Sequence, residues 1–418
     1  MRIIIISNIE WSDENAFGNT ISNWFYKMPN VEFMSIYRRY SQPNNLICKK
    51  YYKIKPLSII RNYFTPCNIG EEFEINNCNN TIRHSSNLFE KKIIHCFHKL
   101  GKSILLFIEN WLYSTKKWKN KKFINSIKLF KPDIVFFFVG SSLADYQITV
   151  AIKELIPSCK IVGFIADDVY GVANNKSKKK IIENCISLAD LVYGCSEVLV
   201  ENYSRMFNVK IDILYKGCTF DKDIIQKNNI IKKIVYAGNL HYGRVKTLAK
   251  LAKCIEEHNK RNNAQIELNI YTNEILNNEQ KASLNIQGAS ELFDTKPYRE
   301  IKEIMDKADI TLHVESFDEE NIKVVRYSFS TKIIDCLQSS SVLFAIGPSN
   351  IASIDFAKKV PGAFVVTNMS DVPIILKQIS GEDLYQRSIE MRKFAIVNFD
   401  IKNIQNKILS DFEELVNN

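Results

Sequence analysis

The sequence lacks three features that would assign it to a common class of protein. It has no run of about 18 apolar residues, so we predict no transmembrane helix. The N-terminus carries one arginine and four isoleucines before polar residues follow, which indicates a buried strand and not a signal peptide. The ten cysteines form no C-x-x-C pair, which is typical of buried thiols in a reducing compartment. We therefore expect a cytoplasmic protein.

The chain also has fewer acidic than basic residues. The chain has 56 Lys and Arg against 46 Asp and Glu, a net charge of +10. This excess favours anionic partners such as nucleotides, nucleic acid or an anionic membrane, but it is equally consistent with a genome-wide bias towards lysine, asparagine and isoleucine. The basic residues of 91–131 are not combined with base-stacking aromatics on strands, so we expect no nucleic-acid partner.

A basic segment stands out between Lys91 and Lys131. It contains eleven lysines and a single acid, Glu109, together with Trp111 and Trp118. Basic charge with interfacial aromatics suits peripheral contact with an anionic membrane. A pair of ordinary surface helices is the alternative.

Apolar runs of strand length, most of them separated by possible helices, occur in both halves of the chain. In the first half they cover 2–7, 31–37, 133–139, 160–165, 191–196 and 210–215. In the second half they cover 233–238, 266–271, 284–288, 309–314, 341–346 and 363–367. Continuous apolar strands that alternate with helices imply parallel sheets covered on both faces. We therefore predict an α/β chain with two doubly wound, Rossmann-like domains.

The domain boundaries follow from changes in composition. The polar stretch 221–233 marks the join between the halves, and an insertion at about 41–130 interrupts the first. Within it, the Asn-rich part 41–90 is expected to be a loop or a partly ordered excursion, and a helical stripe of apolar residues runs from Ile93 to Trp111. We predict an N-terminal domain at 1–222, a C-terminal domain at 223–395, and a C-terminal helix at 396–418 that packs back on the first domain.

In open parallel sheets, ligands bind beyond the carboxyl ends of the strands. After the first strand, Gly18 and Asn19 lie where a helix should begin, with Asn19 or Thr20 as its cap, and a glycine there would expose backbone N–H groups. After the strand at 160–165, Asp167 and Asp168 could act as a general base or bind sugar hydroxyls, or could cap the next helix. We prefer Asp168 for chemistry, because Asp167 follows the strand so closely that it is placed to serve the backbone.

The second half opens with a strand-to-helix turn that combines glycine with basic residues. Gly238, Asn239 and Gly243 are followed by Arg244 and Lys246. Glycines permit close approach of a ligand, and the cations can pair with phosphate oxygens. The spacing is not G-x-G-x-x-G, so a dinucleotide fingerprint is absent. Arg244 is the stronger candidate, and Lys246 is equally consistent with an exposed surface position.

A second polar cluster lies in the stretch 327–348. Ser330, Thr331 and Lys332 open a short predicted helix, and Asp335 follows one turn later. Three serines then precede an apolar strand that ends in Gly-Pro.

Together these features resemble the GT-B glycosyltransferases, and among them the family 4-type enzymes that build bacterial surface polysaccharides. The resemblance is carried by the two-domain layout, the basic turn, ADITLHVESFD at 308–318 and FSTKIIDCLQSSSVLFAIGP at 329–348. KGCTFD at 216–221 resembles the Asn-Gly-Val-Asp element that commonly closes the first domain of such enzymes. It covers most of the chain but not roughly 41–130. It implies two domains that face each other across a cleft.

The resemblance also implies an activity. Such enzymes transfer a sugar from a UDP- or GDP-linked donor to a glycan or lipid-linked acceptor, with retention of the anomeric configuration. No metal and no other cofactor is expected, and the D-x-D pattern of the metal-dependent fold class is absent from the expected context. His95 and His98 flank Cys96, but without a fourth ligand they are best interpreted as structural.

The resemblance assigns roles to the candidate residues. Arg244 and Lys332 would neutralise the diphosphate and act in catalysis, and Ser330 and Thr331 would offer hydroxyls and helix amides to it. Asp335 would stand where a glutamate usually holds the ribose hydroxyls. Further donor contacts fall to Gly238 and Asn239, the acceptor side to Gly18, Asn19 and Asp167, and catalysis on the first domain to Asp168.

The sequence departs from the family pattern at the usual Glu-x7-Glu pair. Asp335 replaces the second glutamate and Tyr327 the first, and Ser339 to Ser341 replace a Gly-rich turn. These departures favour an alternative, a non-catalytic scaffold or binding subunit of a polysaccharide synthesis complex. A sugar-nucleotide 2-epimerase shares the domain plan, but it would need cleft acids and histidines for which His241 and His313 are weak evidence.

Overall fold

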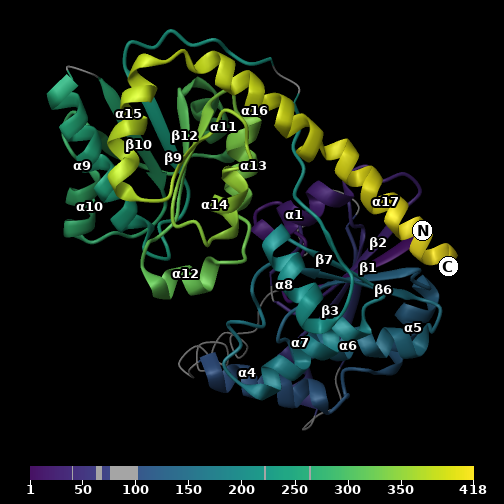
Figure 1. Cartoon of the computed structure of the whole chain (residues 1–418). Helices are drawn as coiled ribbons and strands as arrows, with labels where there is room; N and C mark the ends of the chain where they lie inside the picture. The colour runs from purple at the N-terminus through teal and green to yellow at the C-terminus, as the bar shows by residue number, and fades with distance from the viewer. Residues whose placement is uncertain (40, 63–67, 76–101, 221–222, 263–264) are drawn as a thin grey trace. The chain divides into compact units, whose positions relative to one another are not determined.

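The computed structural model describes residues 1–39, 41–62, 68–75, 102–220, 223–262 and 265–418. The chain divides into two compact units, each with its own sheet (Figure 1). Unit 1 comprises Met1–Gly194, Val200–Ile213 and Gln405–Asn418, and unit 2 comprises Cys195–Leu199 and Leu214–Ile404. Unit 2 thus takes in residues on the N-terminal side of position 223, and the final helix supplies residues to both units.

Unit 1 is built on an eight-stranded sheet in the order β4-β3-β2-β1-β5-β6-β7-β8. Its strands are β1 (Arg2–Ile6), β2 (Glu32–Tyr37), β3 (Lys50–Ile54), β4 (Gly70–Glu74), β5 (Ile134–Phe138), β6 (Lys160–Ile165), β7 (Leu191–Gly194) and β8 (Ile211–Ile213). All neighbours pair in parallel except β3 and β4. The central strand β1 is buried from Ile3 to Ile6 and pairs with residues 134–137 of β5. Burial on both faces explains why the central strands β1 and β5 are almost uniformly apolar in sequence.

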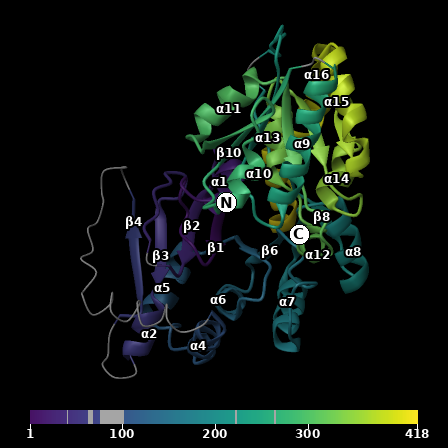
Figure 2. The same cartoon turned by 90° about the vertical axis from the view of Figure 1, so that its left-hand side faces the viewer.

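The prediction of a loop over 41–90 is wrong for β3 and β4. They extend the sheet beyond β2, with β4 at its edge (Figure 2). β3 buries Tyr51 and Tyr52 but also carries lysines, and the edge strand β4 contains three glutamates. Charged side chains on an edge strand discourage pairing with other chains, and here they conceal the strand period. The predicted helical stripe from Ile93 to Trp111 is helical over its described part, which lies in α4 (Lys102–Ser114). Its beginning at Ile93 and the pair His95 and His98 lie outside the described residues.

Helices cover the sheet of unit 1. They are α1 (Ala16–Phe25), α2 (Pro56–Asn62), α4 (Lys102–Ser114), α5 (Lys121–Phe130), α6 (Leu143–Leu155), α7 (Lys176–Leu188), most of α8 (Glu197–Phe207) and most of α17 (Ile401–Asn417). α17 packs through the buried Phe412, whose ring centroid lies 6.3 Å from that of Phe25. The Tyr193 hydroxyl donates to Asp411 at 2.6 Å. Within the described ranges, no helix is long and apolar enough to cross a membrane.

Unit 2 is built on a six-stranded parallel sheet in the order β11-β10-β9-β12-β13-β14. Its strands are β9 (Lys232–Ala237), β10 (Ile266–Thr272), β11 (Ser290–Asp294), β12 (Ile310–Val314), β13 (Val342–Ile346) and β14 (Phe364–Val366). Its helices are α9 (Arg244–Asn262), α10 (Asn278–Leu284), α11 (Tyr298–Lys307), α12 (Glu319–Val325), α13 (Thr331–Gln338), α14 (Ala352–Ala357), α15 (Val372–Gly381) and α16 (Leu384–Phe399). The chain proceeds from β9 to β10 and β11 on one side and to β12, β13 and β14 on the other. The strand order therefore reverses between β9 and β12.

The predicted strand at 284–288 is wrong. Its first residue ends α10, which Asn277 and Gln280 start with a reciprocal capping box, and the strand β11 begins only at Ser290. Gly288 adopts a φ of 73°, which suits a turn and not a strand. Each of the other apolar runs predicted in the second half overlaps a strand.

Candidate functional site

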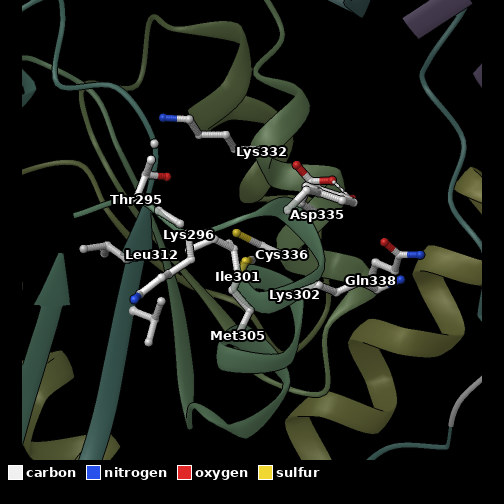
Figure 3. A pocket seen from close by; sticks show the side chains of 14 residues that line it. Thr295, Lys296, Ile301, Lys302, Met305, Leu312, Lys332, Asp335, Cys336 and Gln338 are labelled. Carbon is white, nitrogen blue, oxygen red and sulfur yellow. Dashed lines mark hydrogen bonds between the residues drawn. The ribbon is translucent and has the colours of Figure 1, made fainter. Parts of the chain in front are cut away.

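Unit 2 contains a cavity of about 310 Å³ between α11 and α13 (Figure 3). Four residues of α11 at positions i, i+3, i+4 and i+7 form one wall: Tyr298, Ile301, Lys302 and Met305. Residues of α13 form the other wall: Lys332, Asp335, Cys336 and Gln338. The strands β9 and β12 contribute Val235, Ala237 and Leu312. The cavity therefore adjoins the two strands between which the strand order reverses, where open α/β sheets commonly bind ligands.

Lys332 lines one part of this cavity. Its Nζ donates to the Tyr236 hydroxyl at 3.2 Å and lies 4.9 Å from the centroid of that ring. Burial, followed by the charge of Arg244, lowers the pKa of Lys332 to about 8. Within the described part of the chain, no carboxylate forms an ion pair with Lys332. A half-buried ammonium without such a pair is suited to an anionic ligand.

Gly238 makes room for this lysine at the end of β9. Its φ is 150°, and a Cβ atom at this position would lie 1.9 Å from Lys332 Nζ. Any larger residue would therefore displace the ammonium.

Asp335 supplies the carboxylate of the cavity, and its side chain is 27% exposed. Its Oδ1 accepts a hydrogen bond from the Tyr298 hydroxyl at 3.1 Å and lies 3.8 Å from Lys216 Nζ. Burial raises the pKa of Asp335, and Lys216 and the Tyr298 hydrogen bond oppose that effect. Sequence analysis missed Tyr298 and Lys216, since neither lies near Asp335 in the chain.

Ser330 and Thr331 lie at the start of α13, as the sequence indicated. Ser330 is the N-cap but makes no side-chain capping bond, and its N–H donates to Ser353 Oγ at 2.9 Å. Thr331 is exposed. The structure therefore brings Ser330, Thr331, Lys332 and Asp335 together on one short helix.

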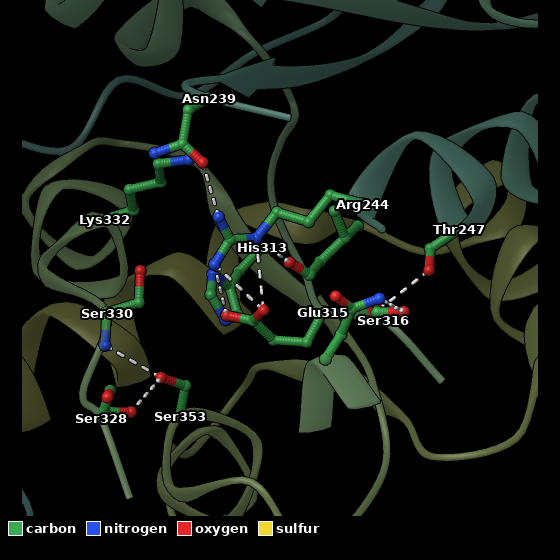
Figure 4. A network of polar contacts seen from close by, with 12 residues as sticks. Asn239, Arg244, Thr247, His313, Glu315, Ser316, Ser328, Ser330, Lys332 and Ser353 are labelled. Carbon is green, nitrogen blue, oxygen red and sulfur yellow. Dashed lines mark hydrogen bonds and ion pairs between the residues drawn. The ribbon is translucent and has the colours of Figure 1, made fainter. Parts of the chain in front are cut away.

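Arg244 is held inside a buried ion pair (Figure 4). Its Nε and Nη2 donate to the Glu315 carboxylate at 3.0–3.2 Å, and its Nη1 donates to Asn239 Oδ1 at 2.6 Å. Both side chains are nearly inaccessible, with 10% and 2% exposed. Glu315 therefore offsets the charge that was expected to neutralise a diphosphate. The signal for Glu315 was an acid directly after a buried strand, the same signal that singled out Asp167.

His313 lies beneath this pair and completes the network in Figure 4. Its Nε2 is 3.3 Å from Glu315 Oε1, and burial lowers the pKa of the imidazole. His241 instead pairs with Glu274 at 3.0 Å on the exposed turn after β9.

The three serines after α13 have a structural role. All three are buried, and the Ser341 hydroxyl donates to the backbone carbonyls of Met305 and Ala308. Lys227 Nζ donates to Ser340 O and Ser341 Oγ at 2.8 Å each. These bonds tie the turn that leads from α13 into β13 to the C-terminal end of α11.

In unit 1 the acidic pair after β6 is used in the opposite way to that expected. Asp168 is buried, and its Oδ1 accepts the Gly171 N–H and the Tyr203 hydroxyl, each at 2.9 Å. Asp167 is the exposed member of the pair. The carboxylate that accepts a backbone hydrogen bond is thus Asp168, because the N–H of Gly171, three residues later, points back to it.

The predicted caps of the first helix are also wrong. α1 begins at Ala16, and the side chain of its N-cap Asn15 accepts the Gly18 N–H at 2.7 Å. A Cβ on Gly18 would lie 1.9 Å from the carbonyl oxygen of Ser12, so the glycine permits close packing and its N–H is already bonded. Asn19 is exposed on the same helix. One strand, β5, lies between β1 and β6, so Gly18 and Asn19 do not follow a strand adjacent to that of Asp167 and Asp168.

Comparison with known proteins identifies the fold. No family model and no curated protein matches the chain. A trehalose-phosphate synthase (UDP-forming) from Burkholderia vietnamiensis is 9% identical over 99% of this chain and 100% of its own, with a TM-score of 0.61. A glycosyltransferase from Rickettsia africae is 14% identical over 100% and 99%, with a TM-score of 0.62.

A third similar structure covers less of its own chain. It is a mutant of S. aureus TarM in complex with Fondaparinux, alpha-GlcNAc-glycerol and UDP, which is 15% identical over 69% of this chain and 58% of its own, with a TM-score of 0.51. At such low identities the likeness concerns the fold. The chain has the α/β fold of the GT-B glycosyltransferases, so the predicted fold class is confirmed.

Proposed function

We propose that the chain is a glycosyltransferase that moves a sugar from a UDP- or GDP-linked donor to a glycan or lipid-linked acceptor. The observation that carries the proposal is the cavity between α11 and α13, which presents the ammonium of Lys332 and the carboxylate of Asp335 from one helix. The ammonium suits the diphosphate, and the carboxylate suits ribose hydroxyls. Two proteins of the same fold support this donor class: one is described as UDP-forming, and the other was solved with UDP.

The chemistry follows from where charge develops. As the bond between the sugar and the diphosphate breaks, negative charge grows on the phosphate oxygens. Lys332 and the first amides of α13 would stabilise that charge without a resident metal. The new glycosidic bond forms to an acceptor hydroxyl, whose proton passes to an oxygen of the departing diphosphate. Retention of configuration and a role in surface polysaccharide synthesis remain part of the proposal, on the resemblance to family 4.

The test is donor binding and turnover by Lys332→Ala. Calorimetry with UDP and GDP measures donor binding. Transfer assays over a panel of nucleotide sugars should show a loss of about a hundredfold in kcat/KM, since a preorganised charge-stabilising group contributes that much or more. Lys246→Ala is the matched control, because Lys246 is 72% exposed and pairs with Asp318. Turnover by Lys332→Ala at the level of the control would contradict the proposal.

The second candidate is a non-catalytic scaffold or binding subunit of a polysaccharide synthesis complex. It is favoured by the pairing of Arg244 with Glu315, which leaves fewer uncompensated cations at the site than the family pattern implies. Calorimetry separates the two: a folded wild-type protein that binds neither UDP nor GDP supports the scaffold.

We further propose that the protein is cytoplasmic and makes peripheral contact with the inner face of an anionic membrane through α4. Phe107 and Trp111 are 72% and 51% exposed on this helix, and the exposed Lys116 and Lys117 follow it. Exposed apolar side chains beside lysines suit such a surface. Trp118, which the sequence analysis also counted as interfacial, is instead buried and donates to Tyr113 O at 2.9 Å.

Vesicle flotation tests this contact. Phe107→Ser should reduce binding to vesicles that contain anionic lipid, whereas Ile275→Ser, at a fully exposed apolar position of unit 2, should not. Equal flotation of the two variants would contradict the assignment to α4.

A further inference from the structure

We propose that Tyr298 and Lys216 are positioning residues that hold the Asp335 carboxylate as a reader of the ribose hydroxyls of the donor. The inference rests on the proposed function, because it states how the same site would recognise a ribonucleoside. It assigns roles to two residues that the sequence analysis did not count as site residues.

The two contacts with Asp335 end on the same oxygen. The Tyr298 hydroxyl donates to Oδ1 at 3.1 Å, and Lys216 Nζ lies 3.8 Å from it. Within the described residues, Oδ2 makes no hydrogen bond and no ion pair. A carboxylate can accept about four hydrogen bonds over its two oxygens. One oxygen is thus fixed by the protein, while the other keeps its capacity to accept bonds from a diol.

The location of Asp335 suits a ligand contact. Asp335 and Lys332 are one helical turn apart on α13, and both line the cavity (Figure 3). Phosphate and ribose are neighbours in a nucleoside diphosphate, so an ammonium and a carboxylate at this spacing can contact both parts of one ligand. The side chain of Asp335 is 27% exposed, so a solute can reach it.

The residues that hold Asp335 are themselves held in place. Lys216 begins a segment in which Cys218 N–H donates to Phe399 O at 2.7 Å and the Ile401 N–H donates to Cys218 O at 3.0 Å. The same segment is tied to α13, since Gln338 Nε2 donates to Thr219 O at 2.7 Å. Tyr298 is the first residue of α11, after the N-cap Pro297. An aspartate is one methylene shorter than the usual glutamate, and two fixed partners would compensate by fixing its orientation.

Stability alone does not explain this arrangement. Tyr298 lies at the rim of the cavity, where 61% of the residue is exposed. The hydrogen bond from its hydroxyl to Asp335 is exposed as well. Ion pairs and hydrogen bonds at exposed positions contribute little to the stability of a fold. The contacts of Tyr298 and Lys216 instead orient the Asp335 carboxylate and favour its ionised form, which accepts hydrogen bonds.

The test compares ribonucleotides with analogues that lack the diol. Calorimetry measures the affinity for UDP and GDP, each against its 2′,3′-dideoxy form. The wild-type protein should prefer the ribonucleotide by about tenfold, the usual effect of a hydrogen bond to a charged group. Tyr298→Phe, which removes one hydroxyl, and Lys216→Met should each reduce this preference to about twofold while the affinity for the dideoxy form stays the same. Lys216→Arg should restore it.

Lys302→Met is the matched control. Lys302 also lines the cavity, and its charge favours the ionised form of Asp335, but it makes no described hydrogen bond or ion pair with that carboxylate. This variant should weaken both nucleotides by the same factor and leave the preference unchanged. Tyr298→Phe should add nothing in an Asp335→Asn background, because the two residues act through one contact.

The outcomes separate this inference from the proposed function. Nucleotide binding with a wild-type preference in Tyr298→Phe, or with no ribose preference at all, overturns the inference and leaves the proposed function in place. A folded wild-type protein that binds no nucleoside diphosphate overturns both.

Discussion

The carboxyl edges of the two sheets use similar residues for different purposes. After β6 in unit 1, the carboxylate of Asp168 is buried and bonded to Gly171 and Tyr203. In unit 2, Lys332 and Asp335 line a cavity. Both sets were candidates for the same reason, a polar group beyond a buried strand. The difference shows that a local turn can use a side chain fully for its own backbone, and that only longer-range contacts decide which polar groups remain for a ligand.

The same contrast exists within unit 2 between the two cations predicted to bind the diphosphate, Arg244 and Lys332. Arg244 is bonded on three of its nitrogens to Glu315, Asn239 and a backbone carbonyl, whereas Lys332 has one described hydrogen bond, to a phenol. Arg244 is therefore held by the turn after β9 and by Glu315, whereas Lys332 has no described carboxylate partner and fits the ligand role that we propose for it.

The largest expected effect comes from Arg244→Ala. Its removal leaves Glu315 buried without its partner, which should lower the free energy of unfolding of unit 2 by about 3–5 kcal/mol. All four tryptophans lie in unit 1, at positions 11, 24, 111 and 118. Urea unfolding should therefore shift when followed by circular dichroism, and much less when followed by tryptophan fluorescence. A folded, stable Arg244→Ala protein with lost donor binding would instead restore a diphosphate role for this residue.

Asp168→Ala tests the other side of the comparison. The change leaves the Gly171 N–H and the Tyr203 hydroxyl without their acceptor, so it should destabilise unit 1 by about 2–3 kcal/mol. Here the tryptophan transition itself should move to lower urea. Asp167→Ala, at the exposed position, should change the transition by less than about 0.5 kcal/mol. If Asp168→Ala left stability intact but abolished transfer, the catalytic role first expected of it would stand.

The smallest expected effect is a pH dependence of donor binding. Lys332, whose pKa is lowered to about 8, loses its proton as the pH rises through that value. Donor affinity should therefore fall by about tenfold between about pH 7 and about pH 9, since roughly a tenth of the lysine stays charged one unit above its pKa. Lys227 has a pKa of about 8 as well, so Lys332→Arg is the control that separates them. An arginine stays charged over this range, and a profile for Lys332→Arg as steep as that of the wild type would exclude Lys332 as the cause.

The sequence was sufficient for the regular parts of the fold. Runs such as 134–138 and 342–346 are apolar because both faces of the sheet are covered, so they can be recognised locally. It failed at 284–288, where the capping box of α10 and the turn at Gly288 determine the structure, and at β3 and β4, where charge hides the strand period.

The site was predictable only in part, for a related reason. Lys332 and Asp335 share one helical turn and were found together. Glu315, Tyr298 and Lys216 act on partners that are 71, 37 and more than a hundred residues away in the chain. Such pairings depend on the topology of the sheet and leave no local pattern in the sequence.

The contact between Gly238 and Lys332 has an evolutionary consequence. A Cβ at position 238 would lie 1.9 Å from the lysine Nζ, and the φ of 150° strains any residue with a side chain there. Among homologues we therefore expect glycine at 238 even where position 332 is not lysine. A lysine at 332 beside this glycine would then mark which relatives have kept a cation at this site.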